Sequence, residues 1–185
     1  MKQLVLLGLV ASLALSACKK KDPQASLPAA TQVGANTAGC LINGQAFVAA
    51  DYGGGLLSNP IPALSYGFAF DSVYYLVMTG AYQGGRATVS LFIRTQKKGI
   101  YLLNQDTQYY PLGSPRVVAN SAVFTTAGSA GEVYVTNAQH TGKVELSRAD
   151  LSSGIGAGTF EFTAASQADP TKTVTITNGR FDRKQ

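Results

Sequence analysis

The chain lacks tryptophan, and its 185 residues include only one histidine and two cysteines. With this few His and Cys side chains, the chain can form neither a disulfide framework nor a zinc site of clustered His and Cys. We therefore expect no metal and no cofactor. From residue 38 onward, eleven Lys and Arg side chains stand against nine Asp and Glu side chains, a difference of two. Nucleic-acid binding depends on a clearly basic surface, so we expect no nucleic-acid partner.

The chain also lacks helical periodicity after residue 17, because no window of about ten residues repeats apolar side chains at helical spacing. Short runs rich in Val, Thr, Tyr and Phe alternate instead with turn residues, and there are 20 glycines. This pattern predicts a single all-β domain, either an antiparallel β-sandwich or a closed barrel of about 8–10 strands. A hairpin is expected at 41–47, and strands are expected at 64–70, 73–79, 87–94, 99–104, 117–125, 132–136, 143–147, 159–163 and 173–177.

The first 17 residues have the pattern of a bacterial export signal. Lys2 precedes an apolar run from Leu4 to Ala17, which is shorter than the roughly 20 residues of a membrane-spanning helix. The run ends in Leu15-Ser16-Ala17-Cys18, the pattern of a lipobox, in which the cysteine receives acyl chains before cleavage. We therefore expect a signal peptide at 1–17, a lipidated Cys18 with a flexible tether at 18–37, and a folded domain at 38–185.

Lipidation at Cys18 would make the membrane the first partner of this protein. Acyl chains contribute about 0.8 kcal/mol per buried methylene, enough for a permanent anchor when two or three are present. Lys19, and not Asp, follows the cysteine, a pattern typical of lipoproteins sent to the outer membrane. We expect an outer-membrane lipoprotein of the cell envelope, and the sequence leaves open whether the domain faces the periplasm or the cell surface.

Three short motifs bracket the folded part of the chain: 39–47 (GCLINGQAF), 158–164 (GTFEFTA) and 175–182 (TITNGRFD). Together they resemble a family of Bacteroidetes lipoproteins of unknown function, the DUF6252 type. The resemblance implies an envelope location and a β fold, and it brings no catalytic residues. As structure, Asn43-Gly44 predicts a tight hairpin, Asn178-Gly179 predicts a turn or bulge, and Arg180 and Asp182 are expected to point outward from a terminal strand.

Few residues are candidates for chemistry. Cys40 stands in an apolar strand context that predicts a buried, inert thiol. The adjacent Tyr109 and Tyr110 could stack on a sugar or pack on a partner. We therefore expect a noncatalytic binding or structural module, not an enzyme, with an envelope protein or a glycan as partner.

Two other functions stay open from the sequence. A barrel with an apolar interior cavity would serve as a lipocalin-like carrier of a small ligand. A glycan hydrolase would require two carboxylates across one cleft, and Glu145 and Glu161 on neighbouring strands are the candidates.

Overall fold

Antiparallel strands form nearly all the regular structure of this protein. The computed structural model describes residues 22–69, 73–106, 119–127, 131–150 and 152–184, and these contain no α-helix. The elements are η1 (Pro23–Ser26), β1 (Thr37–Ile42), β2 (Gln45–Val48), β3 (Leu64–Ala69), β4 (Val73–Tyr82), β5 (Gly85–Ile93), β6 (Gly99–Leu102), β7 (Ser121–Thr126), β8 (Val133–Val135), β9 (Gly142–Asp150), β10 (Ile155–Ser166) and β11 (Thr173–Lys184). The predicted all-β class and single domain are confirmed.

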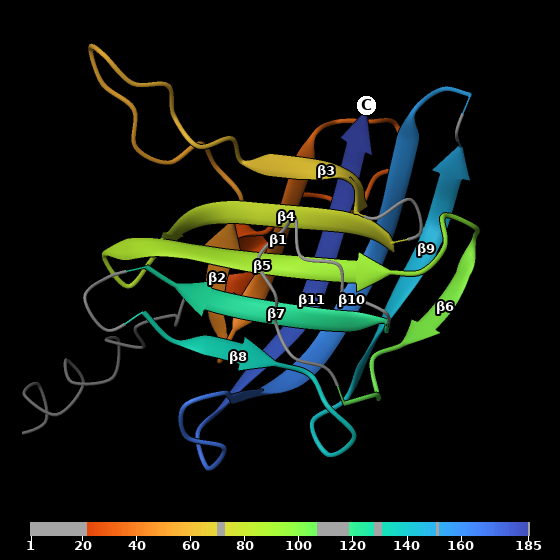
Figure 1. Ribbon diagram of the computed structural model, residues 1–185. Coiled ribbons are helices and arrows are strands. Elements are labelled where there is room, and N and C mark those ends of the chain that lie inside the picture. The colour runs from red at the N-terminus through yellow and green to blue at the C-terminus, as the bar shows by residue number, and fades with distance from the viewer. Residues whose placement is uncertain (1–21, 70–72, 107–118, 128–130, 151, 185) are drawn as a thin grey trace, which may run out of the picture.

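The strands form one sheet that curls into a half-barrel. Its order is β2-β1-β11-β10-β8-β7-β5-β4-β3, with β9 paired to β10 and β6 paired to β9. Figure 1 shows β3, β4, β5, β7 and β8 running across β1, β11, β10 and β9, which lie behind them. The corner is at β10, which pairs with β9 along most of its length and with β8 at Ala165 and Ser166.

The first hairpin has the predicted turn. Asn43 and Gly44 both have positive φ, 47° and 80°, and Ile42 pairs with Gln45 across the turn. After β2 the chain crosses to the other layer, where the Ala50 N–H donates to the Thr79 carbonyl at 2.9 Å. This bond links the two layers on the side of the half-barrel opposite β10.

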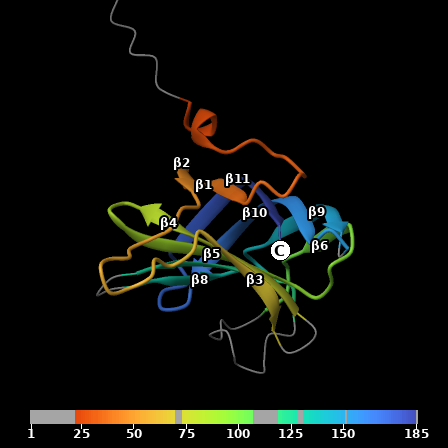
Figure 2. The same cartoon turned by 90° about the horizontal axis from the view of Figure 1, so that it is seen from above.

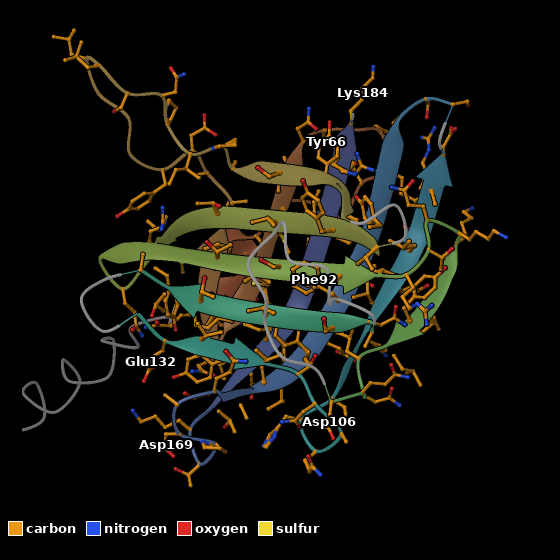
Figure 3. All side chains as sticks on the ribbon, in the orientation of Figure 1. Tyr66, Phe92, Asp106, Glu132, Asp169 and Lys184 are labelled. Atoms are coloured by element: carbon orange, nitrogen blue, oxygen red, sulfur yellow. The ribbon has the colours of Figure 1, made fainter. Side chains whose placement is uncertain are left out.

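The core lies between the two layers and is filled by large side chains. Fully buried members from both layers include Phe47, Ile42, Leu76, Met78, Leu91, Ile93, Leu103, Ile176, Val89 and Val144. A second, smaller cluster of Val73, Phe92, Val123 and Val135 alternates with these along the front strands, so it lies on their opposite face. Figure 3 shows Phe92 on β5 in this front layer.

Strands β9, β10 and β11 form the predicted meander with one wet face. Val144, Phe160 and Ile176 point into the core, while Glu145 and Thr159 are exposed. The predicted bulge occurs where the β10–β11 register shifts between Phe160 and Phe162, beside Asn178 with its φ of 53°. A Cβ on Gly179 would lie 2.5 Å from the Phe160 ring and carbonyl, so the close approach of the strands requires glycine.

Strand β11 differs from the sequence expectation in its place and in its exposure. It is an interior strand of the sheet, hydrogen-bonded to β1 on one side and to β10 on the other, and not a terminal edge. Asp182 is 1% exposed and not outward in solvent. The reason is that residues 28–36, which precede β1, lie across the outer face of β11 and cover it (Figure 2). We call residues 28–36 the strap.

Candidate functional site

The three residues with the most specific predicted roles lie outside the described residues. These are Cys18, the expected lipidation site, and Tyr109 and Tyr110, the expected partner contacts. In the part of the chain that the structure describes, no helix has the length and apolarity to cross a membrane.

Cys40 and His140, the cysteine and the histidine that the structure describes, are both packed or hydrogen-bonded within the fold. Cys40 is fully buried in β1, as the sequence predicts, and burial raises the pKa of its thiol to about 12. His140 is partly buried, and its backbone N–H donates to the Asn137 side chain at 2.7 Å. Among the described residues, no three His, Cys, Asp or Glu side chains are grouped so that they could hold a metal ion.

A groove runs along the wet face of β9, β10 and β11. Three neighbouring hollows of about 170, 340 and 360 Å³ share lining residues and follow one another along this face. The strap residues 30–32 line the first hollow, and Leu102 lines the last. We call this surface the outer groove, and the side chains that line its middle are Lys143, Glu145, Thr159, Glu161 and Arg180.

The outer groove brings together the two glutamates that the sequence singled out. Glu145 lies opposite Thr159, and Lys143 lies opposite Glu161, on adjacent strands. Glu145 and Glu161 are therefore diagonal neighbours, a relation that places their Cα atoms about 7–8 Å apart. Lys143 Nζ lies 3.1 Å from Glu161, and both side chains are about half exposed, at 51% and 54%. Two carboxylates and two cations, Lys143 and Arg180, thus share one open surface.

The buried carboxylate of Asp182 holds the strap. It accepts hydrogen bonds from Thr31 Oγ1 at 2.6 Å and from the backbone N–H groups of Val33, Gly34 and Ala35 at 2.9, 2.8 and 3.2 Å. Burial opposes ionisation of this carboxyl, but the four hydrogen bonds outweigh it, and the pKa of Asp182 is lowered from its ordinary 3.8.

Two further contacts hold the strap at its middle and at its C-terminal end. The Lys184 N–H donates to Asn36 Oδ1 at 2.7 Å, and Arg148 donates to the Gln32 carbonyl at 2.6 Å. The described part of the expected tether, residues 22–36, is therefore hydrogen-bonded to the domain along the strap.

The next residue of β11, Arg183, was not among the residues predicted to have a role. Its side chain is 4% exposed and lies between the layers at one mouth of the half-barrel. The guanidinium carbon is 3.9 Å from the centre of the Tyr66 ring and 5.0 Å from that of Tyr74, and Nε donates to the Tyr74 hydroxyl. Burial raises the pKa of Tyr74, and the neighbouring Arg183 charge partly offsets that rise. The sequence does not indicate that Arg183 is buried, because a buried arginine and an exposed one give the same local sequence pattern.

The comparisons with known proteins give one match. A family model described as Domain of unknown function (DUF6252) matches residues 63–183, which are 121 of the 185 residues. This confirms the predicted DUF6252 family and bears on neither the lipid anchor nor the source. The match begins after the 39–47 motif, so it supports only the two C-terminal motifs. No curated protein and no solved structure matches the chain.

Proposed function

Since the chain belongs to the DUF6252 family, whose description states no activity, we propose a function from its own residues. The protein is a noncatalytic binding module of the cell envelope, anchored through lipid on Cys18, and it binds an uncharged glycan in the outer groove. The anchor is supported by the Leu15-Ser16-Ala17-Cys18 pattern. Lys19 to Lys21 would lie beside anionic headgroups, where each cation contributes about 1 kcal/mol.

The observation that carries the glycan proposal is the lining of the outer groove. Lys143 and Arg180 balance Glu145 and Glu161, so the surface has no net charge to attract an ion. Carboxylates accept hydrogen bonds and cations donate them. A surface with both kinds of group, open along three strands, suits an extended chain of hydroxyl groups.

The packing of the interior favours a binding surface over the lipocalin-like carrier. A carrier needs an apolar cavity inside the barrel. Here the space between the layers is occupied by buried side chains such as Phe47, Met78 and Leu91, and the hollows of the outer groove lie on the opposite face of β9, β10 and β11.

One observation favours a second candidate, glycan hydrolysis, because Glu145 and Glu161 line the same groove. Against this, Glu161 is paired with Lys143 and half exposed, whereas a general acid needs surroundings that keep it protonated. The decisive variant is Glu161→Gln. Cleavage of an envelope glycan by the purified protein would contradict the noncatalytic assignment. Loss of that cleavage in Glu161→Gln would assign Glu161 a catalytic role, and cleavage that survives the variant would exclude Glu161.

Binding is tested by equilibrium titration of neutral envelope polysaccharides against the mature protein. The variant Lys143→Ala/Glu161→Ala removes one ion pair from the groove and should weaken binding about tenfold, which corresponds to about 1.4 kcal/mol. The matched control is Lys172→Ala/Glu132→Ala, which removes an ion pair of the same 3.1 Å length from outside the groove. Equal weakening by both variants, or no binding by the wild type, would contradict the proposal.

The anchor has its own test. Cells fed an alkyne-bearing fatty acid should label the wild-type protein and retain it in the outer-membrane fraction. Cys18→Ser should lose both the label and the membrane retention. A labelled Cys18→Ser protein would show that the acyl group is carried elsewhere.

A further inference from the structure

The segment between β2 and β3 projects from the domain and ends in two leucines. It folds back on itself, because Tyr52 and Ile61 exchange two backbone hydrogen bonds of 2.9 Å. Gly55 and Ser58 pair in the same way, so Leu56 and Leu57 form the tip. We call residues 51–63 the arm, and Figure 1 shows it extending beyond both layers at the upper left.

The two leucines at the tip are not packed against the domain. Their exposed fractions are 100% and 97%, the highest among the large apolar side chains of the described residues. A two-residue turn is usually built from Asn, Asp or Gly, and the positive φ angles of the arm lie at Gly53 and Gly54, so turn geometry does not require leucine. Single exposed apolar residues are common, but two at the end of a projecting arm offer a contact to something outside the domain.

The arm carries no charge beyond its base. From Tyr52 to Ala63 there is no Asp, Glu, Lys, Arg or His, and the Asp51 carboxylate at the base accepts the Ala63 N–H at 2.8 Å. Charged groups are costly to bring into a bilayer, whereas leucine favours it. The backbone polar groups of the tip still need partners, which limits its depth to the boundary between headgroups and acyl chains.

The arm leaves the domain on the side where the described chain begins. Both of its ends are held by Thr79 of β4, whose carbonyl accepts from the Ala50 N–H at 2.9 Å and whose N–H donates to the Ala63 carbonyl at 2.8 Å. Asp22 and Gln83, in the β4–β5 turn, border one hollow. Figures 1 and 2 both show the arm and the β4–β5 turn at the left. A bilayer that carries a lipid near Asp22 would therefore lie on the side of the arm.

We propose that the arm inserts Leu56 and Leu57 into the lipid bilayer that carries the anchor. The inference rests on the lipid anchor of the proposed function and does not depend on the glycan. Two leucine side chains are smaller than one acyl chain, which by itself gives only marginal binding. The anchor makes their insertion intramolecular and so raises the effective concentration of the bilayer. This second attachment restricts the angle at which the domain stands on the membrane.

A single fluorescent reporter tests the insertion. The chain has no tryptophan, so Leu56→Trp places the reporter at the tip alone. The unlipidated mature protein is coupled through Cys18 to a maleimide-bearing lipid in phosphatidylcholine vesicles, because its other thiol, Cys40, is fully buried. On coupling, the emission should shift to shorter wavelength, and lipids brominated in their acyl chains should quench it.

The matched control is Ile100→Trp. Ile100 is 63% exposed on β6, and Figure 1 shows β6 on the side of the half-barrel away from the arm. Its emission should stay unshifted and unquenched in the same vesicles. No quenching of Leu56→Trp, or equal quenching of both variants, would overturn the proposal. Since the coupling is chemical, this result is independent of whether cells acylate Cys18, so failure of the anchor and failure of the arm are distinguishable.

The leucines themselves are tested by substitution. Adding Leu57→Ser to Leu56→Trp should reduce the quenching, and unchanged quenching would contradict a role for Leu57. Leu56→Ser/Leu57→Ser should keep the wild-type melting temperature, because both side chains are exposed. In sedimentation equilibrium without lipid, the unlipidated wild type should be a monomer. A dimer that Leu56→Ser/Leu57→Ser dissociates would show that a second copy covers the tip and would overturn the proposal.

Discussion

Asp182 and Arg183 are consecutive residues of β11, both nearly inaccessible, and their surroundings are opposite in kind. Asp182, 1% exposed, accepts four hydrogen bonds from the strap. Arg183, 4% exposed, has one hydrogen bond, two tyrosine faces and a buried donor without a partner. Side chains alternate across a strand, so the two charges lie on opposite faces and cannot neutralise each other.

The difference shows how far the fold itself satisfies each of the two charged side chains. A buried carboxylate whose acceptor sites are filled by its own chain stabilises the fold and has nothing left to offer a ligand. A buried guanidinium with unused donors weakens the fold unless something binds to it. The fold therefore satisfies the charge of Asp182 and leaves that of Arg183 partly unpaired, and variants of each residue in turn test the difference.

The largest effect is expected at Asp182. Asp182→Ala leaves Thr31 and the N–H groups of Val33, Gly34 and Ala35 without their acceptor. Hydrogen bonds to charged groups contribute about 1.5–3 kcal/mol each, but the freed groups can bond water at the surface, so we expect a loss of about 3 kcal/mol in the free energy of unfolding. Urea denaturation measures it. A loss under about 1 kcal/mol would mean that the strap is not held by this carboxylate.

Acid should remove the same contribution. The pKa of Asp182 is lowered in the folded state, so the folded protein binds fewer protons and its stability rises with pH. The contribution is complete above the ordinary pKa of 3.8 and is lost as the pH falls through the lower folded value. In urea denaturation at a series of pH values, wild type and Asp182→Ala should differ at neutral pH and converge in strong acid. A gap that persists there would contradict the assignment.

The smallest effect on stability is expected at Arg183. Arg183→Met keeps an unbranched side chain about as long as the arginine as far as Nε and removes a charge that no described carboxylate balances. The lost ring contacts and the avoided desolvation oppose each other, so the free energy of unfolding should stay within about 1 kcal/mol of the wild type. Urea denaturation at neutral pH measures this change in the free energy of unfolding. A loss as large as that of Asp182→Ala would mean that Arg183 is structural, and the comparison would fail.

Much of the fold is readable from local sequence. Asn43-Gly44 predicts its own turn because both positions need positive φ, and the alternation in β9, β10 and β11 predicts a meander. The pairing of β1 with β11 is not readable, because it joins residues far apart in the chain. That pairing makes β11 an interior strand, so the expectation of a terminal strand was wrong. The expectation that Asp182 points into solvent was wrong because the strap covers it.

The sites are less predictable than the strands. Glu145 and Glu161 could be placed together because they lie on adjacent strands of one hairpin. The position of the strap could not be predicted, because its hydrogen bonds to Asp182 come mainly from backbone N–H groups, which every residue has except proline. Its Pro, Ala and polar residues are also those of a flexible spacer. Arg183 becomes notable only once Tyr66, Tyr74 and Gln96 surround it, and these come from three separate parts of the chain.

The segment before the strap would limit how far the domain can stand from the lipid proposed on Cys18. Asp22 and Pro23 border the same hollow as Gly44 and Gln45, beside the first hairpin (Figure 2). Only four residue steps separate Cys18 from Asp22, a leash of at most about 14 Å. A domain of this size has a radius of gyration of about 15 Å. If Cys18 carries the proposed lipid, a connection this short would keep the domain from tumbling freely above the bilayer and would hold the first hairpin on the side that faces the lipid.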